Sequence, residues 1–318
     1  LLRDNAILGN ALVDMYAKCG MFTKAQEVLK QLPIRNTVTW NVLISGYTQQ
    51  GQGHEAIISF EQMQRDGVSP DVVTFISILK ACGKTGDVDK GNQICDAIWS
   101  RGLLENNIAL GNALVDMYAK CGLLRNAKKV LKQLHLRNVI SWNTIIAGYA
   151  ECGQGHEALS CLEEMQSEGL SPDVVTFICI LKACGNLKDF EKGRQIHEEI
   201  VNRGVLAEKD ILLSTALLDM YAKCGMLVIA QQLFDKIPDR NVVSWSALIA
   251  GYVQHERSHE ALHCFEEMQH EGIFPDSVTF ICVLKACGNI GAIKKGEYIN
   301  EKIVERGMLK KDIVLGAA

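Results

Sequence analysis

The chain has 318 residues, of which 48% are apolar, and its 33 Lys plus Arg against 37 Asp plus Glu give a net charge of −4. The apolar fraction excludes a wholly disordered chain. The charge balance excludes a uniformly basic nucleic-acid binder but leaves room for a local basic stripe. No apolar run reaches the roughly 18 residues of a membrane-spanning helix.

Three blocks of sequence recur along the chain with a period of about 102 residues. LGNALVDMYAKCG at 8–20 returns unchanged at 110–122 and as LSTALLDMYAKCG at 213–225. WNVLISGY, which starts at Trp40, returns from Trp142 and Trp245 as WNTIIAGY and WSALIAGY. The block DVVTFISILKACG at 71–83 returns at 173–185 and 276–288. Self-similarity at a fixed period is the signature of a repeat architecture.

Each period divides into three helical hairpins. Ala11, Leu12, Met15 and Tyr16 share one helix face, and Gly20 ends that helix. The nine predicted hairpins are 6–36, 37–71, 72–107, 108–138, 139–173, 174–210, 211–241, 242–276 and 277–312. Residues 1–5 are expected to be the tail of an earlier hairpin and 313–318 the start of another, so the chain reads as a segment of a longer array.

The hairpins are expected to stack on one another. One hairpin cannot bury its apolar face alone, whereas a stack of hairpins shares a continuous core. No Pro- or Ser-rich linker interrupts the series. The sequence therefore predicts an all-α fold, a right-handed superhelical solenoid, and not two globular domains.

Two patterns that suggest metal or disulfide chemistry belong to the repeat itself. HEALH at 259–263 matches a zinc-protease motif, but the equivalent positions are HEAII from His54 and HEALS from His156, and no third ligand is evident. The chain has 12 Cys without a C-x-x-C motif, and ten of them recur at equivalent positions. We therefore expect packing cysteines, a reducing compartment, no metal and no cofactor.

The three hairpin types resemble the short (S), pentatricopeptide (P) and long (L) motifs of the PLS class of the pentatricopeptide repeat family. The resemblance rests on ALVDMYAKCG, on the TW or SW start followed by GY, and on VTFxxxLKACG, and it covers nearly the whole chain. It implies single-stranded RNA as partner, with one base read per motif. Members of this class are associated with C-to-U RNA editing in plant mitochondria and plastids, so the resemblance implies one of these organelles.

The resemblance also implies which residues read bases: the fifth residue and the last residue of each motif. In the S and P motifs the pairs are Asn10 with Asn36, Asn41 with Asp71, Asn112 with Asn138, Asn143 with Asp173, Thr215 with Asn241, and Ser246 with Asp276. In the L motifs Ile76, Ile178 and Ile281 precede Asn107, Asp210 and Asp312. The side chain of isoleucine cannot form hydrogen bonds, so the bases opposite the L motifs stay unassigned. A role of these isoleucines as spacers or core residues is the alternative.

The second residue of each motif should form an apolar wedge between neighbouring bases. These residues are Ile7, Val38, Val73, Ala109, Ile140, Val175, Leu212, Val243 and Val278. Six recurring lysines on first helices are candidates for phosphate contacts, with acidic residues on the opposite face: Lys18, Lys80, Lys120, Lys182, Lys223 and Lys285. Helix-end charges that complement the helix dipole explain the same lysines equally well.

In the family's terms Asn with Asp favours U, Asn with Asn favours C or U, Thr with Asn favours A, and Ser with Asp favours G. The expected target is 5′-YUnYUnAGn-3′, where Y is a pyrimidine. The chain itself is expected to be an addressing segment and not an enzyme. The alternative is a protein-binding scaffold that contacts small accessory editing factors through its L motifs, since helical repeats also bind peptides.

Overall fold

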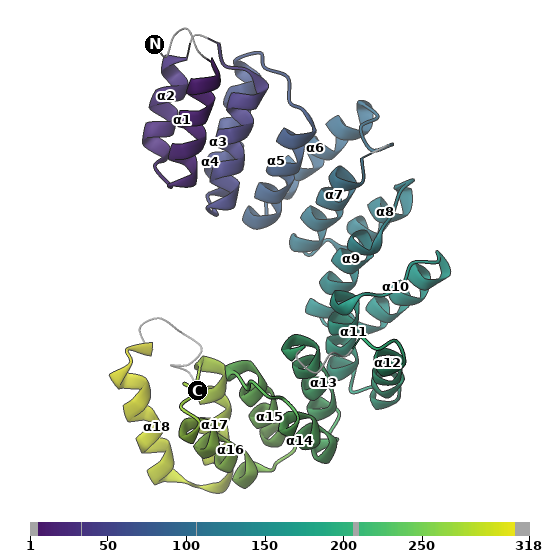
Figure 1. Ribbon diagram of the computed structural model, residues 1–318, viewed down its shortest axis with the longest axis vertical. Coiled ribbons are helices and arrows are strands. Elements are labelled where there is room, and N and C mark those ends of the chain that lie inside the picture. The colour runs from purple at the N-terminus through teal and green to yellow at the C-terminus, as the bar shows by residue number, and fades with distance from the viewer. Residues whose placement is uncertain (1–5, 33, 106, 206–209, 309–318) are drawn as a thin grey trace. The chain divides into compact units, whose positions relative to one another are not determined.

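A computed structural model describes residues 6–32, 34–105, 107–205 and 210–308 (Figure 1). The described residues form eighteen α-helices and no strand. The first helices of the motifs are α1 (Ala6–Lys18), α3 (Thr37–Gln49), α5 (Val72–Thr85), α7 (Ile108–Lys120), α9 (Val139–Glu151), α11 (Val174–Leu187), α13 (Ile211–Lys223), α15 (Val242–Gln254) and α17 (Ser277–Ile290). The second helices are α2 (Phe22–Gln31), α4 (Gly53–Arg65), α6 (Val88–Ser100), α8 (Leu124–Gln133), α10 (Gly155–Ser167), α12 (Phe190–Asn202), α14 (Leu227–Asp235), α16 (Ser258–His270) and α18 (Ile293–Glu305).

Local sequence sets both ends of the first helices. Every first helix begins at the residue where the sequence places the start of a motif. In the S motifs the chain leaves the helix through a left-handed glycine, with φ of 72° at Gly20, 74° at Gly122 and 80° at Gly225. Only glycine adopts this conformation without strain, so the chain turns back into a second helix at the same point in each S motif.

The chain groups into two compact units, which we describe separately. Unit 1 comprises the described residues within 1–152 and 163–171, and unit 2 those within 153–162 and 172–318. In unit 1 the odd-numbered helices from α1 to α9 pack on one another in sequence, and α2, α4, α6 and α8 pack beside them (Figure 1). Unit 2 repeats this arrangement with α11, α13, α15 and α17 in one row and α12, α14, α16 and α18 in the other.

The recurring apolar residues of the repeat form the core of each unit. Trp142 in unit 1 and Trp245 in unit 2 are each 1% exposed. Six of the cysteines are also buried, namely Cys82, Cys95, Cys161, Cys184, Cys264 and Cys287. Burial raises the pKa of Cys82, of Cys184 and of Cys264 to about 12 each, so these thiols stay protonated at neutral pH. This placement agrees with their expected role in packing.

The first helices approach one another closely where an L motif meets the next S motif. A Cβ added to Gly83 of α5 would lie 3.3 Å from the Met117 Cα atom of α7. A Cβ on Gly185 of α11 would lie 3.2 Å from the Met220 Cα atom of α13. The recurring glycine of the LKACG block thus lets two helix backbones touch.

Candidate nucleic-acid interface

The last residue of each motif has a local structural role, because it caps the first helix of the next motif. Its side-chain oxygen accepts a hydrogen bond from the backbone N–H of the residue three positions later, in the first turn of that helix. This satisfies a donor that the helix leaves unpaired. The eight described capping residues are Asn36, Asp71, Asn107, Asn138, Asp173, Asp210, Asn241 and Asp276. Asp312 lies outside the described residues.

The capping residue and the fifth residue of the same motif meet at the junction between two first helices. Asn41 on α3 donates from Nδ2 to Asp71 Oδ1 over 2.9 Å. Asn112 Nδ2 lies 3.5 Å from Asn138 Oδ1, and Ser246 Oγ lies 3.4 Å from Asp276 Oδ1. The two residues that the resemblance implies as one reading pair, some thirty positions apart in sequence, therefore lie side by side.

A hydroxyl group that sequence reasoning missed completes four of these junctions. It belongs to the third residue of the following motif. Thr39 donates to Asn10 Oδ1 over 2.7 Å, Thr74 to Asn41 Oδ1 over 2.5 Å, and Ser141 to Asn112 Oδ1 over 2.5 Å. Thr279 Oγ1 lies 2.6 Å from Ser246 Oγ. The signal in the sequence was the Thr or Ser that recurs three residues after the last residue of every S and P motif.

The Thr215 junction differs from these four. Thr215 Oγ1 is buried and has no hydrogen-bond partner among the described residues. Asn143 is 8% exposed in unit 1, and its predicted partner Asp173 caps α11 in unit 2. In the L motifs Ile76, Ile178 and Ile281 are half-buried, so their side chains contribute partly to packing.

The nine second residues of the motifs are all exposed. Eight of them range from 52% exposed at Val175 to 83% at Ile7, and Ala109 is exposed as well. Each lies one position before the third residue of its motif, which is Thr, Ser or Leu. Exposed aliphatic side chains at a fixed interval form a surface suited to contact flat apolar groups.

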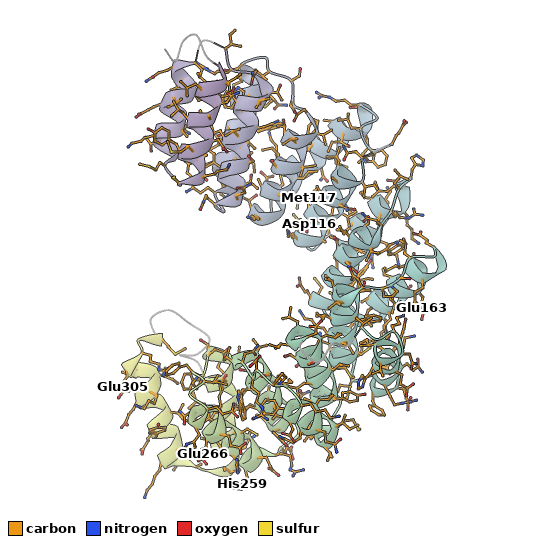
Figure 2. All side chains as sticks on the ribbon, in the orientation of Figure 1. Asp116, Met117, Glu163, His259, Glu266 and Glu305 are labelled. Carbon is orange, nitrogen blue, oxygen red and sulfur yellow. The ribbon has the colours of Figure 1, made fainter. Side chains whose placement is uncertain are left out.

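The six recurring lysines divide into two groups. Lys18, Lys120 and Lys223 of the S motifs pair with Asp14, Asp116 and Asp219 over 2.7, 2.7 and 2.6 Å. Asp116 lies near the end of α7, in the row of first helices, whereas Glu163 lies on α10, in the row of second helices (Figure 2). The expectation that acidic residues avoid the lysine face is therefore wrong for α1, α7 and α13, because a carboxylate four residues before the lysine stabilises these helices.

The lysines of the L motifs, Lys80, Lys182 and Lys285, are exposed, and no ion pair holds them among the described residues. The stems of Lys120 and Lys223 pack instead near Gly83 and Gly185, where an added Cβ would come within 3.4 Å and 3.1 Å of them. Lys120 and Lys223 thus have a structural role, whereas Lys80, Lys182 and Lys285 are exposed cations without an ion pair among the described residues.

Hydrogen bonds keep Asp71 charged. Partial burial raises the pKa of this carboxyl, but the Thr74 N–H, the Asn41 amide and the Thr74 hydroxyl outweigh burial and hold the pKa below its usual value. At neutral pH the Asp71 carboxylate can therefore accept hydrogen bonds but cannot donate them.

Within the described ranges, no cluster of three or more His, Cys, Asp or Glu side chains is arranged to hold a metal ion. His259 and His263 of the HEALH sequence are both exposed on α16 (Figure 2 labels His259). No described helix combines the length and apolar character needed to cross a membrane.

Family models match most of the chain. The model described as "PPR repeat family" matches 35–84, 137–186 and 240–289, and the model "PPR repeat" matches 10–36, 73–103, 112–139, 175–205 and 214–242. The chain belongs to the pentatricopeptide repeat (PPR) family. Both are models of repeats, which agrees with the expectation that this segment is not an enzyme.

Similar PPR proteins come from Arabidopsis thaliana. The pentatricopeptide repeat-containing protein At1g06140, mitochondrial, is 35% identical over 90% of this chain and 51% of its own length. The protein At4g18520, chloroplastic, is 38% identical over 91% of this chain and 46% of its own length. The chain thus spans about half the length of these relatives.

Solved PPR structures share the fold. The structure of the pentatricopeptide repeat protein PPR10 in complex with an 18-nt psaJ RNA element has a TM-score of 0.77 and 18% identity, over 92% of this chain and 44% of that chain. PPR10 from maize has a TM-score of 0.57 and 20% identity, over 94% of this chain and 49% of that chain. The prediction of an all-α solenoid is confirmed.

Proposed function

We propose that this segment binds single-stranded RNA and reads one base per S or P motif. The observation that carries the proposal is the junction geometry: Asn41 and Asp71, which are 30 residues apart, lie within 2.9 Å of each other and beside the exposed Val73. A polar pair next to an aliphatic surface offers hydrogen bonds to a base edge and contact to a base face. That is the chemistry by which unpaired bases are recognised.

The proposed target is 5′-YUnYUnAGn-3′, read from the pairs in chain order. Asn donates and accepts, so it can address a pyrimidine edge, whereas ionised Asp only accepts. The similarity of the junctions at Asn41 and Ser246, each joined to an aspartate and a threonine hydroxyl, supports one common recognition scheme with different base preferences.

We also propose that the chain is the PLS-type recognition segment of an organellar C-to-U editing factor. The S, P, L order of motif lengths supports the PLS class, and the relatives named mitochondrial and chloroplastic support a mitochondrial or plastid location. Catalysis would then belong to another domain or to a partner, and small accessory editing factors are proposed partners of the L motifs.

Binding to labelled RNA tests the proposal directly. The chain should bind YUnYUnAGn RNA more tightly than a scrambled RNA of equal composition, and both affinities should fall as salt rises, because lysine contacts release counterions from the phosphates. Equal affinity for the two RNAs at matched salt contradicts base reading. Affinity for a protein partner that is unchanged by salt, in a chain that does not bind RNA, would favour the scaffold function instead.

A further inference from the structure

The hydroxyl of the third residue of a motif reaches back to the fifth residue of the preceding motif. The junction between α3 and α5 shows this most fully. Thr74 Oγ1 lies 2.5 Å from Asn41 Oδ1 and 2.9 Å from Asp71 Oδ1, and it accepts a hydrogen bond from the Asp71 backbone N–H over 3.1 Å. One side chain therefore contacts both members of a proposed reading pair.

The distances at this junction favour one hydrogen-bond arrangement. The Thr74 hydroxyl accepts from the Asp71 N–H and has one hydrogen to donate, with two acceptors in reach: Asn41 Oδ1 at 2.5 Å and Asp71 Oδ1 at 2.9 Å. The contact to Asn41 Oδ1 is the shorter of the two, so the hydrogen points toward that oxygen. The amide oxygen of Asn41 then faces Thr74, and its nitrogen faces the carboxylate of Asp71.

The opposite amide orientation is unfavourable. It would place Asn41 Oδ1 next to Asp71 Oδ1, and these two acceptors would repel each other. In the orientation that the network favours, Asn41, which is 8% exposed, keeps one N–H and one oxygen lone pair that these contacts do not use. At the α7–α9 junction Ser141 repeats the arrangement: it accepts from the Asn138 N–H over 3.2 Å and donates to Asn112 Oδ1 over 2.5 Å.

The sequence couples this hydroxyl to the polar fifth residue. Wherever the fifth residue is Asn, Thr or Ser, the third residue of the next motif is Thr or Ser. Where the fifth residue is Ile76 or Ile178, that third residue is Leu110 or Leu213, and both leucines are fully buried. Helix capping alone does not explain this pattern, because Leu110 and Leu213 also follow capping residues.

We propose that the third-position hydroxyl is a positioning residue for base reading. It holds the fifth-position side chain in one orientation and so decides which donor and acceptor face the RNA. The role rests on the proposed function, and it assigns base selectivity to three residues per junction, one of which belongs to the next motif. A side chain that is already oriented loses less conformational entropy when it binds a base.

One junction lacks the contact and provides a matched control. Ser244 donates to the Asn241 carbonyl over 2.9 Å and accepts from the Asn241 N–H over 3.1 Å, so it completes a capping box. It forms no hydrogen bond to Thr215, whose hydroxyl is unpartnered among the described residues. Removing the Ser244 hydroxyl should therefore weaken the cap without changing the reading of a base.

The experiment measures base selectivity position by position. Wild type, Thr74→Val and Thr74→Ser are titrated with YUnYUnAGn RNA and with versions carrying C, A or G at the second base, which Asn41 and Asp71 read. We expect Thr74→Val to reduce the preference for U there roughly three- to tenfold, the worth of one hydrogen bond. Thr74→Ser should restore the preference, and selectivity at the fifth base should stay unchanged in all three proteins.

Two further variants separate positioning from stability. Ser141→Ala should reduce selectivity at the fourth base, read by Asn112 and Asn138, and it repeats the test should Thr74→Val fail to fold. Ser244→Ala should lower the melting temperature but leave selectivity at the seventh base unchanged.

The outcomes distinguish the two proposals. A wild-type chain that prefers U at the second base, with Thr74→Val and Ser141→Ala as selective as wild type, overturns the positioning role alone. A wild-type chain with no base preference overturns the proposed function and the positioning role together. Loss of selectivity in Ser244→Ala at the seventh base would mean that capping, and not the contact to the reader, controls selectivity.

Discussion

The junction between α3 and α5 and the junction between α5 and α7 join neighbouring first helices through different contacts. At the first, Asn41, Asp71 and Thr74 join the helices through hydrogen bonds. At the second, Gly83 brings the α5 backbone against α7. The third residue of the following motif is here the buried Leu110, whereas it is Thr74 at the first junction. In unit 2 the α15–α17 and α11–α13 junctions repeat this contrast.

This difference indicates a division of roles among the motifs. Polar side chains between helices cost desolvation and are worth little net stability, so a stack built only from polar junctions would be weak. Glycine contacts bury backbone and aliphatic surface at close range and stabilise the stack. Close glycine contacts also occur at S-to-P junctions, where a Cβ on Gly46 would lie 2.8 Å from Ala17 Cβ and one on Gly251 would lie 2.6 Å from Ala222 Cβ. The L-to-S junctions differ from the others in that a buried leucine replaces the hydroxyl group.

The largest expected effect comes from filling a glycine junction. Gly185→Val places two extra methyl groups against the Met220 backbone, where even a Cβ lies at 3.2 Å, and should destabilise unit 2 by about 1–3 kcal/mol through overpacking. Urea denaturation measures the change.

Gly288 is the matched control, because it holds the same position in the third L motif. A Cβ there meets no described atom within 4 Å, and Gly and Val differ by only about 0.5 kcal/mol in helix propensity. If Gly288→Val destabilised the chain as much as Gly185→Val, the close contact would not be the cause.

A second prediction concerns the tryptophan that recurs in the three P motifs. Trp142 donates to Glu168 over 3.0 Å and Trp245 to Glu271 over 3.3 Å, but Trp40 Nε1 is buried without a partner among the described residues. The acid at the equivalent position is Asp66, one methylene shorter, which pairs with Arg35 over 2.9 Å.

Asp66→Glu should give the Trp40 indole an acceptor and stabilise the chain by about 1 kcal/mol, the usual net value of one hydrogen bond. Thermal unfolding measures the gain. Glu168→Asp is the converse change and should lose a similar amount; a gain there would contradict the explanation.

The two groups of lysines give a third prediction. Lys80 and Lys182 lack ion pairs among the described residues, whereas Lys120 and Lys223 pair with aspartates and pack at glycine junctions. In Lys80→Ala with Lys182→Ala, the slope of log affinity for RNA against log salt should fall by about 0.7 per lost phosphate contact. Lys120→Ala with Lys223→Ala should change the slope less, and equal changes would show that all four lysines contact phosphate.

The sequence predicted the fold well because a repeat supplies the same local signals many times. The motif starts coincide with the helix starts from Ala6 to Ser277, since each start carries a capping Asn or Asp. The sequence also placed the fifth and last residues in one pair, but only through family resemblance. It missed the Thr74 hydroxyl, because a Thr three residues after Asp71 reads as an ordinary capping residue, and its contact to Asn41 is visible only in space.

The smallest expected effect is the titration of Asp71. Its lowered pKa depends in part on the Asn41 amide, so Asn41→Ala should raise the pKa toward the value of an ordinary Asp, as followed by NMR of the carboxyl carbon. A folded-state pKa below the unfolded one means that ionised Asp71 stabilises the fold above its ordinary pKa, and that this stability is lost as pH falls through the lowered value. Asn41→Ala should therefore narrow the difference in stability between neutral and acidic pH. An unchanged Asp71 titration in this variant would show that the Thr74 contacts, and not the Asn41 amide, keep the Asp71 carboxyl charged.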